Sequence, residues 1–282
     1  MTAAIPKRVV NIIIGRKLEA LRNSRGMSQA EAGKLLDCTQ NKIGNIERGE
    51  SGVKIPDLAA LLEGYQTDLS LRQDLLDLAR GREGRYSPKS LRARFHGTMR
   101  EVVDLESSAH FLWQHNAMTI PGLLQTEDYM HHLYRSLRPS RTPEYIERET
   151  VNRLERQHIL DDPTKQFWFI IDQAAFERMS NMAGSDAIRR GQKEHIAEMI
   201  DRPNVEVQIV PWEVGFYLGQ SCDYLVFGFK SDPPVEVVYV EEVINDVVTS
   251  QQEEVSAYLT VWEHQKAVAL GPEQSRTFLL AR

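Results

Sequence analysis

The chain has 282 residues, of which 41% are hydrophobic and 26% are charged, and this composition is typical of globular rather than disordered proteins. The length predicts two domains. No apolar run approaches the roughly 18 residues of a membrane-spanning helix, and the N-terminus lacks the apolar stretch and cleavage site of a secretory signal. We therefore expect a cytoplasmic protein with no membrane partner. Cys38 and Cys222 stand far apart and form neither a disulfide framework nor a metal-ligand spacing.

The formal net charge of −6 is unevenly distributed along the chain. Residues 1–100 hold 18 Lys and Arg against 11 Asp and Glu, a net of +7, whereas residues 101–282 hold 16 against 29, a net of −13. Since phosphate attracts Lys and Arg, nucleic acid is a suitable partner for the N-terminal part alone. The acidic remainder is expected to have a different role.

Capping residues divide the N-terminal part into short helices. Apolar residues at helical spacing predict a helix over Ile12–Arg25. Ser28, with Glu31 three residues later, forms a capping box that begins a second helix, and Thr39 is the N-cap of a third. Two short capped helices separated by a few residues make a helix-turn-helix motif. This third helix is predicted over Gln40–Arg48, a fourth begins at Ile55, and a fifth spans Leu69–Ala79.

The third predicted helix has two distinct faces. At about 100° per residue, Ile43, Ile46 and Glu47 fall on one side and three amide side chains fall on the other. Amide side chains pair bidentately with adenine in the major groove, so the amide face predicts base recognition. An ordinary solvated face is the alternative interpretation. The candidate base-reading residues are Gln40, Asn41 and Asn45.

The segment SQAEAGKLLDCTQNKIGNIERGE, from Ser28 to Glu50, resembles the helix-turn-helix of the lambda repressor type, the XRE-like family. The resemblance implies double-stranded DNA as the partner and a homodimer that reads two half-sites. It also implies that Gln29 supports Gln40, and that Arg22 and Glu47 form a structural ion pair. The candidate phosphate contacts that it implies are Gln29, Thr39, Lys42, Arg48 and Lys54.

Residues 80–94 contain six basic residues, one acidic residue, two glycines and Pro88, which predicts a basic linker, with a DNA-contacting arm as the alternative. We therefore expect a helix-turn-helix domain at 1–79, a linker at 80–94 and a second domain at 95–282. Helices are expected there at 99–116, 126–137, 143–160, 173–179, 185–200 and 246–269. Strands are expected at 166–171, 205–210, 224–229 and 235–240. The fold class is an all-α five-helix domain followed by a mixed α+β domain.

Three motifs in the second domain resemble the actinobacterial family of WhiJ-like helix-turn-helix regulators. They are IPGLLQTEDY at 120–129, RLERQ at 153–157 and VPWEVG at 210–215. The resemblance implies transcription regulation in development or antibiotic production, together with a small partner protein encoded by a neighbouring gene. Pro121-Gly122 alone indicates a tight turn, for which a purely architectural role is the simpler interpretation.

A candidate partner or ligand site in the second domain consists of Arg153, Arg156, Gln157 and Trp212. The two arginines share a helix face suited to a carboxylate or phosphate, although ordinary ion pairs with Glu149 or Glu155 would explain them equally well. A ligand-gated switch would need a pocket between the strands and helix 143–160. A protein-interaction module tethered to DNA is a further hypothesis.

No Gly-rich phosphate loop, H-E-x-x-H or G-x-S-x-G motif is present, so we expect a regulator without catalytic residues or a cofactor. Four histidines fall on predicted helices, where surface or core positions are more common than metal sites. We therefore expect no metal site. These histidines are His110, His115, His131 and His132.

Overall fold

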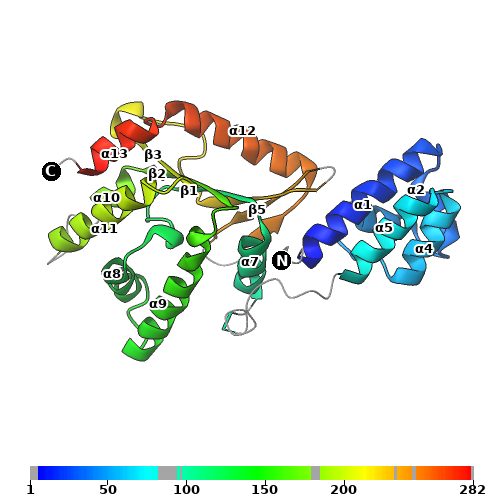
Figure 1. Ribbon diagram of the computed structural model, residues 1–282, viewed down its shortest axis with the longest axis horizontal. Coiled ribbons are helices and arrows are strands. Elements are labelled where there is room, and N and C mark those ends of the chain that lie inside the picture. The colour runs from blue at the N-terminus through cyan, green and yellow to red at the C-terminus, as the bar shows by residue number, and fades with distance from the viewer. Residues whose placement is uncertain are drawn as a thin grey trace.

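The computed structural model describes residues 6–81, 94–95, 97–178, 185–231, 234–242 and 246–280. A helical N-terminal region is followed by a larger domain in which helices surround a six-stranded sheet (Figure 1). This is the fold class that the sequence predicts. Within these residues no helix combines the length and the apolar character needed to cross a membrane. Most of the predicted linker, residues 82–93, lies outside the described residues.

Five helices make up the N-terminal region, as predicted. They are α1 (Lys7–Ser24), α2 (Gln29–Leu35), α3 (Gln40–Glu47), α4 (Ile55–Gly64) and α5 (Leu69–Arg80). The first begins at Lys7, earlier than predicted, because Val9 and Val10 are both buried and extend the apolar pattern toward Pro6. All five contribute to one core, in which Leu18, Ile43 and Leu58 are almost completely buried.

The sheet of the larger domain has the strand order β3-β2-β1-β4-β5-β6. Strands β1, β2 and β3 are parallel to one another, while β4, β5 and β6 continue the sheet in antiparallel fashion from β1. The direction of pairing therefore changes at β1. The strands are β1 (Phe111–Asn116), β2 (Gln166–Asp172), β3 (Val205–Val210), β4 (Tyr224–Phe229), β5 (Val235–Val240) and β6 (Val247–Thr249).

Helices cover both faces of this sheet (Figure 1). On one face, α12 (Gln252–Val268) places the fully buried Trp262 against Trp113 and Trp168 of the sheet. The opposite face packs against several helices and holds the main core. The helices on that side are α7 (Gly97–Ser108), α8 (Glu127–Leu137), α9 (Pro143–Gln157), α10 (Ala174–Glu177), α11 (Ser185–Ile200) and α13 (Pro272–Leu280). Three short 3-10 turns, at Gly122–Leu124, His158–Asp161 and Trp212–Val214, connect these elements.

The predicted elements differ from the structure in three places. Residues 111–116 form strand β1 rather than the end of a helix, because they lie between β2 and β4 in the middle of the sheet. Both faces of a central strand are covered, so the sequence of β1 lacks the clean alternation that identifies a strand. The predicted helix 246–269 begins with the short strand β6, and α13 was not anticipated.

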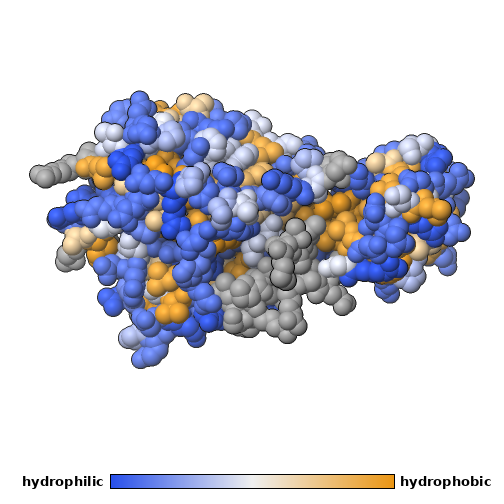
Figure 2. All heavy atoms as spheres, in the orientation of Figure 1, coloured by the Kyte–Doolittle hydropathy of each residue, from blue (hydrophilic) through white to orange (hydrophobic). Residues whose placement is uncertain are grey.

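Helix α1 contributes to both cores. Val10, Ile14 and Leu18 pack in the N-terminal core, whereas Val9 and Ile12 belong to the main core of the larger domain. Apolar side chains are visible where the two parts meet (Figure 2). The first helix of the predicted DNA-binding domain is thus also a packing element of the second domain.

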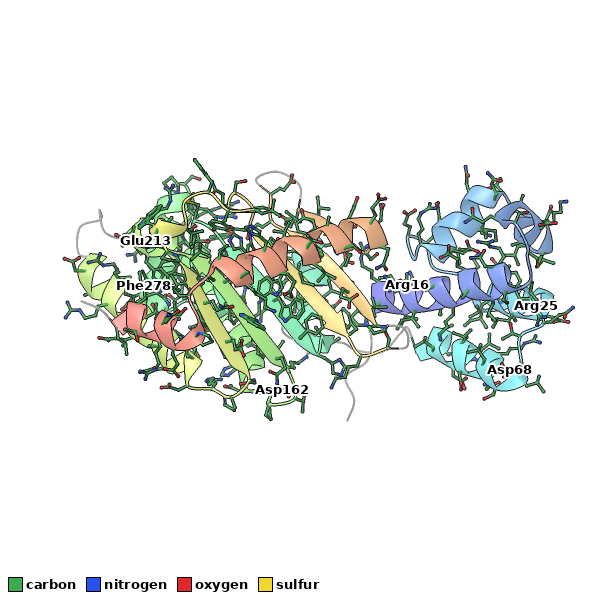
Figure 3. The ribbon with its side chains drawn as sticks, turned by 90° about the horizontal axis from the view of Figure 1, so that it is seen from above. Arg16, Arg25, Asp68, Asp162, Glu213 and Phe278 are labelled. Carbon is green, nitrogen blue, oxygen red and sulfur yellow. The ribbon has the colours of Figure 1, made fainter. Side chains whose placement is uncertain are left out.

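Arg16, in the middle of α1, and Arg25, at its C-cap, make polar contacts with other segments (both residues are labelled in Figure 3). Near the sheet, Arg16 Nη1 donates to the carbonyl oxygen of Pro234 at 3.0 Å. At the far end, Arg25 donates to the carbonyl oxygens of Tyr65 and Gln66, at 2.7 and 2.8 Å. These contacts fix α1 to the end of α4 on one side and to the start of β5 on the other.

Candidate nucleic-acid interface

The two helices of the motif begin at the caps that the sequence predicts. The Ser28 hydroxyl accepts a hydrogen bond from the backbone N–H of Glu31, and the Glu31 carboxylate accepts one from the backbone N–H of Ser28, so the capping box is complete. Thr39 Oγ1 accepts from the N–H of Lys42 at the start of α3. The turn between α2 and α3 includes Asp37 at φ 48, a left-handed conformation that Asp tolerates better than most residues.

Arg22 and Glu47 form a buried ion pair beneath α3. Arg22 Nε and Nη2 lie 2.6 and 3.0 Å from the two carboxylate oxygens of Glu47, which is only 3% exposed. This hydrogen bonding raises the pKa of Arg22. Arg22 Nη1 also donates to the carbonyl oxygen of Met27, at 2.7 Å, so the same side chain ties α1 to the start of α2.

Gln29 completes this network from the first turn of α2. Its Nε2 donates to Glu47 Oε2 at 2.8 Å, and its side-chain amide lies beside Gly44 of α3. The resemblance implied that Gln29 would support Gln40, but the structure places its amide on Glu47 instead. Glu47 therefore receives hydrogen bonds from both α1 and α2, which fixes the orientation of α3.

The outer face of α3 carries the three predicted base-reading residues. Gln40 and Asn41 are exposed, and within the described residues their side chains make no hydrogen bond. Asn45 is half-buried, and its Oδ1 accepts from Arg48 Nη2 at 2.6 Å. The structure therefore brings the three amides onto one surface, with two of them available and the third engaged by an arginine.

The predicted phosphate contacts differ in their surroundings. Lys42 Nζ lies 3.3 Å from Asp57, and Arg48 makes a two-pronged pair with Glu50 at 2.9 and 3.1 Å. The exposed Lys54 has no ion pair within the described part of the chain.

The acidic partners Asp57 and Glu50 were not anticipated from the sequence, although both have sequence signals. Glu50 follows Arg48 by two residues, and Asp57 occupies the acidic first turn of α4. Each competes with phosphate for a cation at the candidate surface.

Three residues of the second candidate site lie on α9 and have different partners. Arg156 pairs with the buried Glu106 at 2.5 and 3.1 Å. Gln157 Nε2 donates to the carbonyl oxygens of Gly122 and Gln125, at 3.0 and 2.8 Å. Arg153 Nη1 donates to the side-chain oxygen of Gln125 at 2.6 Å, and its guanidinium lies over the ring of Tyr134.

Trp212 lies outside this group. Its side chain is 57% exposed on the loop that follows β3. The structure therefore brings Arg153, Arg156 and Gln157 together and leaves Trp212 elsewhere on the domain surface.

The PGLLQT segment is held by glutamine side chains. Gln125 Nε2 donates to the carbonyl oxygen of Ile120, and Gln192 Nε2 from α11 donates to that of Leu124, each at 2.6 Å. Gln192 Oε1 accepts from the N–H of Thr126, the N-cap of α8. These bonds, with the buried side chains of Leu123 and Leu124, support the architectural interpretation of the motif.

The four histidines of the sequence analysis are divided between two elements. His110 and His115 are in or beside β1, and His131 and His132 are on α8. No cluster of metal-ligating side chains occurs among the residues that the structure describes.

A capped α2–turn–α3 unit with an exposed amide face defines a helix-turn-helix protein, a class in which this unit binds DNA. In agreement, a family model described as a helix-turn-helix domain matches residues 13–75. A second family model, described as a domain of unknown function (DUF5753), matches residues 99–281. Since this match covers more than half of the chain, the protein belongs to the DUF5753 family. No curated protein and no solved structure matches the chain.

Proposed function

We propose that this protein is a sequence-specific transcription regulator that reads double-stranded DNA with α3. The observation that carries the proposal is the pair of exposed amides, Gln40 and Asn41, on a helix fixed from beneath by the Arg22–Glu47 pair. Amide groups without a protein partner are free to pair with base edges, and a helix that is already oriented loses little entropy on docking.

The surroundings of α3 support the same function. The net charge of +7 over residues 1–100 attracts the DNA backbone irrespective of sequence. We infer a homodimer, since helices of this kind usually read two half-sites about one DNA turn apart. The resemblance to WhiJ-like regulators supports a cytoplasmic role in development or secondary metabolism, controlled through residues 95–282 by a small partner protein or a ligand.

Genome-wide mapping of bound DNA, followed by binding assays on the recovered site, tests the proposal. Gln40→Ala is expected to reduce discrimination between the site and random DNA by about 1–3 kcal/mol for each base that this side chain reads. Lys54→Ala is expected to weaken binding to the site and to random DNA equally. It is also expected to reduce the slope of log K against log salt concentration by about one. If both substitutions weaken both DNAs to the same extent, α3 does not read sequence.

An exposed apolar loop favours a second candidate function, protein interaction with DNA as a tether. Phe216 is 95% exposed, and Trp212 and Leu218 are 57% and 51% exposed on the same loop. Three large apolar side chains on one loop are unusual for a surface without a partner. Co-purification with the product of an adjacent small gene, abolished in a Trp212→Ser, Phe216→Ser variant that still binds DNA, would support it.

A further inference from the structure

A cavity of about 160 Å³ lies in the larger domain, between the sheet and helices α7, α8 and α9. Its walls combine buried polar side chains, such as Gln114 of β1, with apolar ones, such as Leu123 and Leu133. The exposed Leu137 and Arg138, at the end of α8, lie at its border with solvent. It lies between the strands and helix 143–157, and DNA binding by α3 does not account for it.

Arg153 is a cation in this cavity that makes no ion pair with any carboxylate in the described part of the chain. Within the described residues, the only hydrogen bond of its side chain goes from Nη1 to the neutral side chain of Gln125, and no carboxylate lies within 4 Å. A guanidinium has five N–H donors, so most of its hydrogen-bonding capacity is unused. Arg156, one helical turn away, is instead neutralised by Glu106, to which its Nε and Nη2 both donate.

Glu241 is an anion at the solvent-exposed edge of the same cavity. It follows β5, and within the described residues its carboxylate makes no hydrogen bond and no ion pair. Partial desolvation at this edge raises the pKa of the carboxyl group, and the charge of Arg153 partly opposes that effect. The two groups are therefore near enough to interact and too far apart to neutralise each other directly.

The cavity thus presents two charges of opposite sign, neither of them in an ion pair among the described residues, beside the apolar side chains of Ile120, Leu123 and Leu133. We propose that it binds a free α-amino acid with an apolar side chain, whose carboxylate contacts Arg153 and whose ammonium group contacts Glu241. A cavity of roughly 150 Å³ accommodates a molecule as large as benzene, so the volume suits an amino acid with a side chain of a few carbon atoms. Charge-assisted bonds at both ends and apolar contacts between them give the selectivity.

Isothermal titration calorimetry on the full chain tests this proposal with three matched probes. They are L-leucine, 4-methylpentanoate, which lacks the ammonium group, and 3-methylbutylamine, which lacks the carboxylate. L-Valine, L-isoleucine and L-methionine extend the series. At least one of the four amino acids is expected to bind. The analogues of that amino acid that lack the ammonium group or the carboxylate are expected to bind at least tenfold more weakly. Absence of binding by all four amino acids would overturn the proposal.

Substitutions then assign the two charges. Arg153→Met is expected to weaken amino-acid binding at least tenfold, and Glu241→Gln is expected to abolish the preference for the amino acid over its carboxylate analogue. If Arg153→Met does not fold, Arg153→Lys replaces it in this test. Arg153→Lys keeps the positive charge but loses the planar guanidinium, and it too is expected to weaken amino-acid binding. The control is Arg148→Met, on the exposed side of the same helix, which is expected to bind as the wild type does. Unchanged binding in the Arg153 variants would contradict the assignment.

Discussion

Gly15 of α1 lies directly against the backbone of Glu47, the last residue of α3. A Cβ atom on Gly15 would stand 2.4 Å from the carbonyl oxygens of both Ile46 and Glu47, closer than real Cβ contacts occur. The end of the recognition helix therefore rests on α1, and only a residue without a side chain allows this approach. Because α1 also packs in the core of the larger domain, the position of α3 depends on both parts of the chain.

Gly15→Ala is expected to destabilise the N-terminal domain by about 1–3 kcal/mol, because the added methyl group overpacks a backbone contact that cannot yield cheaply. Urea unfolding measures the change in free energy. Gly81→Ala is the matched control: Gly81 has φ −67, and a Cβ there would meet nothing within 4 Å. Equal stability of the two variants would show that α1 and α3 are less closely packed than described.

Arg22→Ala is expected to destabilise the protein by about 3–5 kcal/mol, because it leaves the carboxylate of Glu47 buried without its cation. The double variant Arg22→Met, Glu47→Leu removes both charges and is expected to recover most of this loss in thermal unfolding. Arg48→Ala breaks the exposed pair with Glu50 and is expected to cost no more than about 1 kcal/mol. A small effect of Arg22→Ala would mean that solvent reaches Glu47.

The sequence predicts the N-terminal domain well because its signals are local. Ser28 and Thr39 cap helices within three residues of themselves, and such hydrogen bonds do not depend on the rest of the fold. Strand β1 was missed for the opposite reason. Phe111–Asn116 is a strand because β2 and β4 pair with it on either side, from positions far along the chain.

The candidate sites divide in the same way. The amide face of α3 could be predicted because helical periodicity depends only on residues 40–47 themselves. The surroundings of Arg153 could not be predicted in this way, since Gln125, Tyr134 and Glu241 come from three separate segments. The sequence offered Glu149 and Glu155 as partners of this arginine because they are near along the helix. Tertiary packing instead pairs Glu155 with Arg94, and Arg153 has no carboxylate within 4 Å among the residues that the structure describes.

Glu50→Gln is expected to increase DNA affinity. In the free protein Glu50 holds Arg48 in a two-pronged ion pair, and its negative charge lies beside the candidate DNA surface. Removal of this charge frees a cation for phosphate and is expected to steepen the dependence of log K on log salt by about one ion. Fluorescence anisotropy at several salt concentrations measures both effects. Glu63→Gln is the control, because Glu63 pairs with Arg72 on α5. Weaker binding by Glu50→Gln would contradict the proposed interface.

Acidification is expected to destabilise the larger domain through His115. This side chain is fully buried, with Nδ1 2.8 Å from the carbonyl oxygen of Cys222, and burial lowers its pKa from the ordinary value of 6.5. The unfolded chain therefore takes up a proton that the folded chain does not. Stability from this group is present above about pH 6.5 and is lost as the pH falls below it.

Urea unfolding between pH 7.5 and 5.5 measures this loss, which reaches at most about 1.4 kcal/mol per pH unit for one group. His115→Gln is expected to flatten the pH dependence relative to the wild type. A pH dependence in His115→Gln that is identical to that of the wild type would exclude His115 as its source.

Helix α7 connects the proposed amino-acid cavity with the DNA-binding region. Met99, Val102 and Glu106 line the cavity, while Glu101 of the same helix pairs with Arg8 of α1. If both proposals hold, the bound amino acid changes DNA affinity through α7 and α1, with coupling of about 1–3 kcal/mol. Glu101→Gln breaks the connecting ion pair and is expected to reduce that change without altering amino-acid binding.

DNA titrations with and without the amino acid, on both the wild type and Glu101→Gln, measure the coupling. Calorimetry with the amino acid on Glu101→Gln shows why the coupling is lost. If the variant no longer binds the amino acid, the substitution has damaged the cavity. If it binds the amino acid as the wild type does, the Arg8–Glu101 pair carries the coupling. The same Glu63→Gln variant serves as the control, since its exposed pair with Arg72 lies away from α7. Coupling of equal size in Glu101→Gln and the wild type would show that the signal does not pass through this ion pair.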